Sequence, residues 1–106
     1  MTWRNFMKEE HNFDVQTTFW EDFGIADRFG VAAVKDTYKR ALEYAKLDYK
    51  YLTELSMVLN HRLWMHYDSG SHSLAKIYDE IWRNCHDYAH DHLKDEELMY
   101  YFRVTD

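Results

Sequence analysis

The 106-residue chain has no proline, only three glycines and a single cysteine. Sandwiches and barrels connect many short strands with turns rich in glycine and proline, so this scarcity argues against such folds. The lone Cys85 excludes an internal disulfide framework and a four-cysteine zinc site. No apolar run approaches the ~18 residues of a transmembrane helix, and the acidic N-terminus lacks the apolar region of a signal peptide. These absences predict a soluble, intracellular, helical domain.

Hydrophobic residues make up 46% of the chain and charged residues 30%, a balance typical of a folded domain. We predict one all-α domain over residues 1–106, a compact bundle of four to five helices, with residues 1–16 packed on the bundle. Thr18 and Glu21 fit a capping box at the start of the first helix. Gly30 fits the left-handed position that closes it, and Asp48 fits a cap at a break between two further helices. The first three predicted helices cover 18–28, 31–47 and 49–67. A loop at 68–73 follows, and Ser71 or Ser73 caps a fourth helix that reaches about Leu93. A short last helix begins after Asp95.

Apolar residues recur at the helical period in three of these segments. The predicted buried positions are Val31, Val34, Tyr38, Ala41, Leu42, Ala45 and Tyr49 in the second helix, Leu52, Leu55, Leu59, Leu63 and His66 in the third, and Leu74, Ile77, Tyr78, Ile81, Cys85, Tyr88 and His92 in the fourth. The third helix also carries Met57, His61 and Trp64 on its opposite side. It is therefore either central in the bundle, which we favour, or exposes a contact patch.

The chain is acidic, with a net charge of −6, which disfavours direct binding to nucleic acid. The fourth helix carries acidic residues on one side, and more follow at the start of the last helix: Glu80, Asp87, Asp91, Asp95, Glu96 and Glu97. Four residues of a helix rise ~6 Å, close to the ~6.8 Å between every second phosphate of a DNA strand. The acids are therefore either a plain solvated face or an imitation of a nucleic-acid backbone.

The seven histidines include one pair with metal-like spacing, His86 and His90, with Asp79 on the same flank. This pair lies away from the buried stripe, so the simpler interpretation is two solvated surface histidines. Cys85 fits a buried thiol, and His66 fits a core histidine with one hydrogen-bond partner. No phosphate-binding loop, dinucleotide fingerprint or GxSxG motif is present. The sequence therefore predicts a protein that is not an enzyme and needs no metal or cofactor.

Three stretches together, 18–40, 49–60 and 93–106, resemble a small family of proteins from phages and mobile elements of gut Firmicutes. The resemblance spans about residues 17–106 and includes no catalytic motif. Relatives tend to have glycine after the Leu-Lys pair where this chain has Asp95. The resemblance implies a phage accessory protein that looks like an inhibitor of host defence, including the anti-CRISPR class.

We therefore expect a protein that binds and inhibits a host defence nuclease with a basic groove, in the cytoplasm of the bacterial host and without a membrane. The predicted partner-binding residues are Glu80, Asp87, Asp91, Asp95, Glu96, Glu97, Met57 and Trp64. The first alternative is a phage assembly protein that forms a homodimer through the face of Met57, His61 and Trp64. The second is a metal-dependent hydrolase that uses His86 and His90.

Overall fold

The structure, a computed structural model, describes residues 17–105. Within this range the chain forms only α-helices: α2 (Phe19–Ala26), α3 (Val31–Ala45), α4 (Tyr49–Ser69), α5 (His72–His92) and α6 (Glu96–Thr105). The predicted all-α bundle of four to five helices is confirmed. None of these helices is both long and apolar enough to span a membrane. The predicted packing of residues 1–16 falls outside the described part of the chain.

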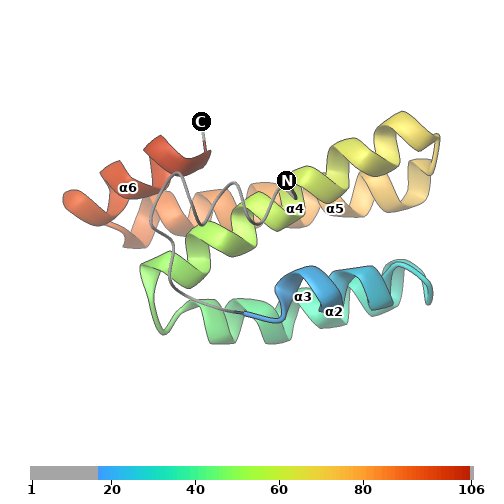
Figure 1. Ribbon diagram of the computed structural model, residues 1–106, viewed down its shortest axis with the longest axis horizontal. Helices are drawn as coiled ribbons and strands as arrows, with labels where there is room; N and C mark the ends of the chain where they lie inside the picture. The colour runs from blue at the N-terminus through green and yellow to red at the C-terminus, as the bar shows by residue number, and fades with distance from the viewer. Residues whose placement is uncertain (1–16, 106) are drawn as a thin grey trace.

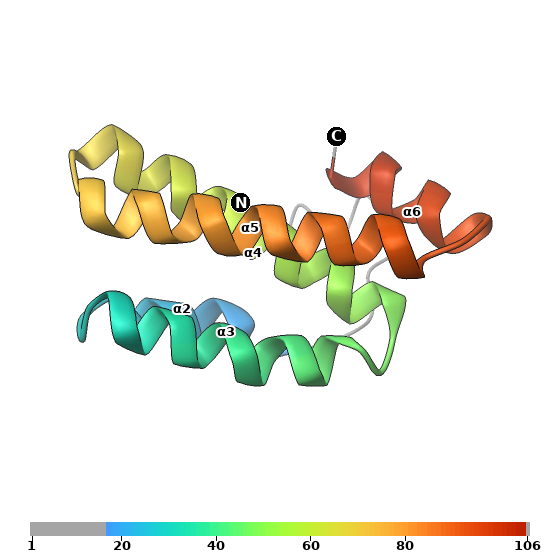
Figure 2. The same ribbon diagram turned by 180° about the vertical axis from the view of Figure 1, so that it is seen from behind.

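The two longest helices, α4 and α5, form an antiparallel hairpin (Figure 1). Helices α2 and α3 lie along one side of this hairpin, and α6 lies on the other side, at the end where α5 finishes (Figure 2). Helix α4 packs against α2, α3, α5 and α6. It is therefore the central helix of the bundle, as its two apolar sides predicted.

The core contains the apolar stripes of α3, α4 and α5, together with aromatic residues from α2 and α6. Its largest fully buried side chains are Tyr78, Tyr101, Phe23, Leu52, Leu55, Leu59, Val34 and Val58. Two positions predicted to be buried, Val31 and His92, are exposed. Each is a terminal residue of its helix, where the neighbouring helices no longer cover the stripe.

The predicted break between the second and third helices is confirmed. The Asp48 carboxylate accepts a hydrogen bond from the Lys50 backbone N–H at 2.8 Å and caps α4. At the other end, α4 continues to Ser69 and stops at Gly70, whose φ of 79° suits a glycine. The loop before α5 is therefore only Gly70 and Ser71, shorter than the predicted 68–73.

The first helix differs from its prediction at both ends. The Thr18 side chain does not cap α2, because its hydroxyl donates to Asp22 Oδ2 at 2.7 Å. The Thr17 hydroxyl instead accepts from the Phe19 N–H at 3.3 Å. The helix ends at Ala26 rather than Arg28. Contrary to the prediction, Gly30 does not close this helix in the left-handed helical conformation but is the N-cap of α3, with φ 104° and ψ −172°; the positive φ still favours glycine at this turn.

Candidate protein-binding surface

One side of α5 is acidic. Glu80, Asp87 and Asp91 are separated by seven and four residues, close to two turns and one turn, so they leave the helix in nearly the same direction. All three are exposed. None forms an ion pair with another residue of the 17–105 range. These carboxylates therefore keep their charge available for contacts outside the chain.

The start of α6 extends this charge. Asp95, Glu96 and Glu97 are exposed, and Glu96 and Glu97 lie in the first turn, where the helix dipole favours carboxylates. Asp95 has a φ of 54°, a conformation that glycine adopts more easily than other residues. Glu97 lines a hollow of about 370 Å³ together with Tyr88 and His92 of α5. The turn after α5 thus brings the acidic start of α6 back toward the end of that helix.

A row of lysines on α3 lies beside the acidic side of α5. The hydroxyl of Tyr38 on α3 donates to Asn84 Oδ1 at 2.5 Å, and Asn84 lies in the same stripe of α5 as the acids. The Lys46 ammonium lies 5.4 Å from the centre of the Tyr88 ring. Lys35 and Lys39 precede Lys46 by eleven and seven residues, on the same side of α3. The acidic face is therefore narrow and bordered by positive charge.

The structure divides the predicted face of Met57, His61 and Trp64. The His61 ring packs on Trp20 of α2, with ring centres 4.8 Å apart. Burial lowers the pKa of His61, and the nearby Arg62 charge lowers it further. Met57 is half-buried, whereas Trp64 is 55% exposed. These residues do not form one continuous apolar patch, because α2 packs across its middle.

The simpler interpretation of the His86 and His90 spacing, two solvated histidines, holds for His90, which is exposed, but not for His86, which is half-buried. The ring centres lie 4.6 Å apart, and His86 Nδ1 lies 2.9 Å from the Tyr101 hydroxyl of α6. The ring of Phe102 packs on His90 at 4.9 Å. Asp79 pairs with Arg83 instead. No group of three or more potential metal-binding side chains occurs between residues 17 and 105.

A buried charged cluster joins three helices around Asp27, the residue that follows α2. Asp27 Oδ2 accepts hydrogen bonds from Arg62 at 3.0 Å and from His66 Nε2 at 2.7 Å. Asp27 Oδ1 accepts a short hydrogen bond from the Tyr78 hydroxyl. The side chains of Asp27, Arg62 and His66 are only 9–13% exposed. His66 is thus the core histidine that the sequence predicted.

The sequence does not predict that Asp27 and Arg62 belong to this cluster. Two features of the sequence point toward it. Gly24 inside a helix leaves room for a neighbouring side chain, and a buried His66 needs a hydrogen-bond partner. A Cβ atom at Gly24 would lie 3.1 Å from an Arg62 guanidinium nitrogen, so glycine gives this side chain its path to Asp27. The cluster is enclosed and its groups bond to one another, which makes it a structural junction between α2, α4 and α5.

Cys85 is also enclosed. Its side chain has no exposed surface, and burial raises the pKa of the thiol to about 12. A thiol in this state is a poor nucleophile because very little thiolate forms. The predicted role of Cys85 as a buried core residue is confirmed.

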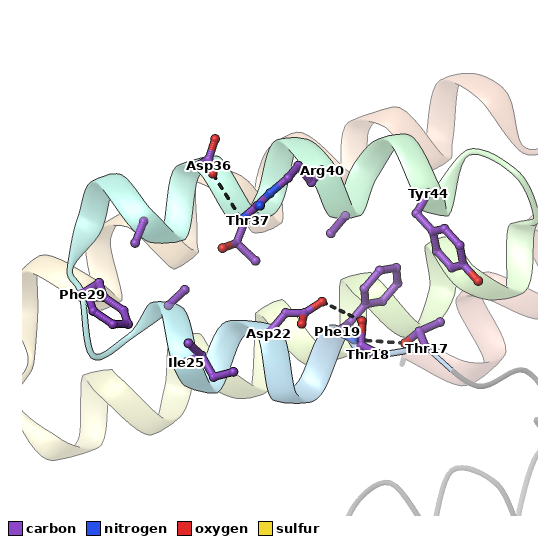
Figure 3. Close-up of a pocket in the computed structure, with 13 residues that line it drawn as sticks. Thr17, Thr18, Phe19, Asp22, Ile25, Phe29, Asp36, Thr37, Arg40 and Tyr44 are labelled. Atoms are coloured by element: carbon purple, nitrogen blue, oxygen red, sulfur yellow. Dashed lines mark hydrogen bonds and ion pairs between the residues drawn. The ribbon is translucent and has the colours of Figure 1, made fainter.

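A hollow of about 640 Å³ lies between α2 and α3 (Figure 3). Its apolar walls include the exposed Ile25 and Phe29. Its charged side chains already have partners, because Asp22 accepts from Thr18 and Asp36 pairs with Arg40 at 3.2 Å. The charged side chains of the hollow are therefore bonded within their own helices.

No family model, curated protein or solved structure matches this chain. Among the described residues, the exposed acids of α5 and α6 are therefore the feature that most directly suggests a function.

Proposed function

We propose that this protein is a binding module that inhibits a nuclease of a bacterial defence system by occupying a basic, nucleic-acid-binding surface of that enzyme. The acidic face, defined here as Glu80, Asp87, Asp91, Asp95, Glu96 and Glu97, would contact the partner. The observation that carries the proposal is that all six side chains are exposed and unpaired within residues 17–105. The resemblance to phage and mobile-element proteins supplies the class of partner.

The size of the acidic face limits what it can imitate. Eleven residues of α-helix separate Glu80 from Asp91, which corresponds to about 16 Å along the axis of α5. The lysine row of α3 borders this strip, so the negative charge does not continue around the molecule. A short backbone segment of a nucleic acid has a comparable length and charge spacing. The module would therefore block a local part of a groove rather than replace a long duplex.

Charge also favours this partner through its effect on association. A net charge of −6 attracts a basic protein surface over a distance set by the salt concentration. Charges at an interface rim mainly change the association rate and its salt dependence. Binding through the acidic face should therefore weaken steeply as salt is raised.

The test is a pull-down from a host-like bacterium followed by measurements on the captured protein. We expect the tagged chain to recover a defence nuclease and to inhibit its cleavage of nucleic acid. The variant Asp87→Lys/Asp91→Lys should reduce affinity at least about tenfold, since two attractive contacts become repulsive. The matched control is Asp36→Lys/Glu43→Lys, which makes the same change of charge on α3, where both acids are exposed.

Equal loss of binding in both variants would show that net charge alone matters and would reject the acidic face as the contact. Recovery of phage structural proteins instead of a nuclease would support the assembly alternative. Recovery of a nuclease whose binding is insensitive to salt and to both variants would place the contact elsewhere on the chain.

A further inference from the structure

Helices α2 and α3 form a hairpin that is covered on one side only. On its inner side the hairpin packs against α4 and α5, and Phe23 and Val34 are fully enclosed there. No other helix of residues 17–105 lies over its outer side (Figures 1 and 2). The hollow of about 640 Å³ opens on this outer side, between the two helices (Figure 3). The outer side is therefore a helical surface that has no partner within the described part of the chain.

The hollow lies beside apolar side chains that project into solvent. Ile25 and Phe29 line it, and 55% and 76% of their surface is exposed. Tyr44 lines the hollow at the end opposite Phe29 (Figure 3). Between these ends the lining includes the short side chains of Ala26, Ala33, Thr37 and Ala41. Exposed apolar groups next to a hollow that they do not fill are typical of an interaction surface.

Charged side chains lie along the outer edge of α3, between the two ends of the hollow. Asp36 and Arg40 are each two positions from Tyr38, about 200° around the helix. Because the Tyr38 hydroxyl bonds to Asn84 of α5, Asp36 and Arg40 point away from α5. Both side chains are at least 67% exposed, and they pair with each other at 3.2 Å.

The neighbouring charges do not give this edge an excess of one sign. Lys39 lies on the flank toward α5, and Glu43, one turn beyond it, pairs with Lys46 at 2.9 Å. On α2, the Asp22 carboxylate accepts a hydrogen bond from the Thr18 hydroxyl. Between residues 36 and 43, the charges of α3 are therefore an acid, two bases and an acid.

We propose that a second copy of the chain covers this outer side, so that the protein forms a two-fold symmetric dimer with its α3 helices antiparallel. A two-fold contact places the same surface of both copies face to face. With the axis between Asp36 and Arg40, Asp36 of each copy meets Arg40 of the other. The same axis lays the Phe29 end of one hollow over the Tyr44 end of the other (Figure 3).

The order of the charges favours a second copy over a different protein. Asp36 and Arg40 already neutralise each other, so a strongly acidic or strongly basic partner would meet one attraction and one repulsion. A second copy presents the same two charges in the opposite order, and both contacts are then attractive. The apolar groups are self-complementary in the same way, because each copy supplies both a projecting Phe29 and a hollow.

The dimer leaves the acidic face accessible, since Asp36 and Arg40 point away from α5. Two acidic faces would then belong to one particle, each open to its own partner. The interface also differs from the face of Met57, His61 and Trp64, which belongs to α4. The inference does not depend on the proposed function, because two chains can pair without a nuclease.

Sedimentation equilibrium of the full-length protein tests the dimer. Over about a 100-fold range of concentration, the mass should rise from that of one chain toward that of two. Phe29→Glu should weaken the dimer at least about 100-fold, because an apolar anchor is lost twice in a symmetric contact. The matched control is Met99→Glu on α6, where the side chain is 71% exposed, and it should leave the dimer unchanged.

Exchange of charges identifies the partner as a second copy. Asp36→Lys and Arg40→Glu should each weaken the dimer at least about tenfold, because each creates two repulsive contacts. An equimolar mixture of the two variants should dimerise as tightly as the unchanged chain, since one copy then offers only bases and the other only acids. Asp79→Lys and Arg83→Glu alter a comparable exposed pair on α5 and should have no effect, alone or mixed.

Three outcomes would overturn the proposal. A single-chain mass at every concentration would leave the surface to residues 1–16 or to a different protein. A dimer that persists in Phe29→Glu but is lost in Trp64→Glu would place the contact at the tip of the α4–α5 hairpin. Failure of the mixed variants to pair would reject the antiparallel arrangement. Affinity for a nuclease is measured below the concentration at which the chain dimerises, so a failure of the acidic face remains a separate result.

Discussion

Asp27 lies almost buried between α2, α4 and α5, whereas Asp87 and Asp91 extend from α5 into solvent. Asp27 accepts hydrogen bonds from Arg62, His66 and Tyr78. The two aspartates of α5 have no ion-pair partner between residues 17 and 105. The same carboxylate group therefore holds three helices together in one place and remains available for a partner in the other.

The difference follows from the cost of removing charge from water. A buried carboxylate is tolerated only when charged and polar groups replace its water, as Arg62, His66 and Tyr78 do for Asp27. An exposed carboxylate keeps its water and contributes little to stability. Mutations at the first kind of site should therefore change folding, and mutations at the second kind should change binding.

The largest expected effect is that of Asp27→Asn. This substitution leaves the Arg62 guanidinium, whose side chain is 13% exposed, without its counter-charge. Breaking a buried pair from one side costs about 3–5 kcal/mol, a large part of the ~5–15 kcal/mol stability of a typical domain. Urea denaturation followed by circular dichroism measures the free energy of unfolding.

Asp36→Asn on α3 is the matched control for this experiment. Asp36 pairs with Arg40 at 3.2 Å, but both side chains are at least 67% exposed. Loss of this exposed ion pair should lower the free energy of unfolding by about 0.5 kcal/mol or less. Similar effects of the two substitutions would contradict the assignment of Asp27 as a structural junction.

A smaller effect is expected for Tyr78→Phe, which removes one of the three donors to Asp27 and keeps the ring. Burial, and then the bond to Asp27, raise the pKa of Tyr78 well above its ordinary value, so the hydroxyl remains a donor at all neutral pH values. A hydrogen bond to a charged group contributes about 1.5–3 kcal/mol, against about 1 kcal/mol for a neutral one.

Tyr38→Phe provides the neutral comparison, because the Tyr38 hydroxyl donates to the Asn84 amide oxygen. Each substitution lowers the free energy of unfolding by some amount. The difference between these two losses isolates the effect of the Asp27 charge. A larger loss for Tyr38→Phe than for Tyr78→Phe would show that the buried charge adds nothing to this bond.

The sequence predicted the bundle because periodicity and local chemistry determine its main elements. Asp48 caps its own helix through a bond to a residue only two positions away. The two apolar sides of α4 required neighbours on both sides, and the structure provides them. Features of this kind depend on residues close in sequence, or on the side of a helix that must be buried.

Apart from errors at helix ends, the sequence missed contacts between distant residues. His86 was expected in solvent because nothing local indicated that α6 folds back and places Tyr101 against it. His61 was grouped with Trp64, although Trp20 of α2 covers it. The partner of His66 is Asp27, which lies 39 residues away. Periodicity identifies which side of a helix is buried but not which side chain meets it.

The smallest expected effect on stability is that of Glu80→Gln/Asp87→Asn/Asp91→Asn. Two opposing terms act on these acids. The lysine row of α3 attracts them, whereas the negative end of the α5 dipole repels Asp91 in the last turn. The net change in the free energy of unfolding should therefore stay within about 0.5 kcal/mol, while affinity for the basic partner falls.

Denaturation at low and high salt separates the two terms, because the variant lacks the screened attraction to Lys35 and Lys39. A loss above about 1.5 kcal/mol at low salt, reduced by added salt, would mean that the acids and lysines stabilise the packing of α3 on α5. The acidic face would then be a second structural junction like Asp27, and the proposal that it serves a partner would fail. An unchanged stability with reduced binding would place the two kinds of carboxylate in separate roles.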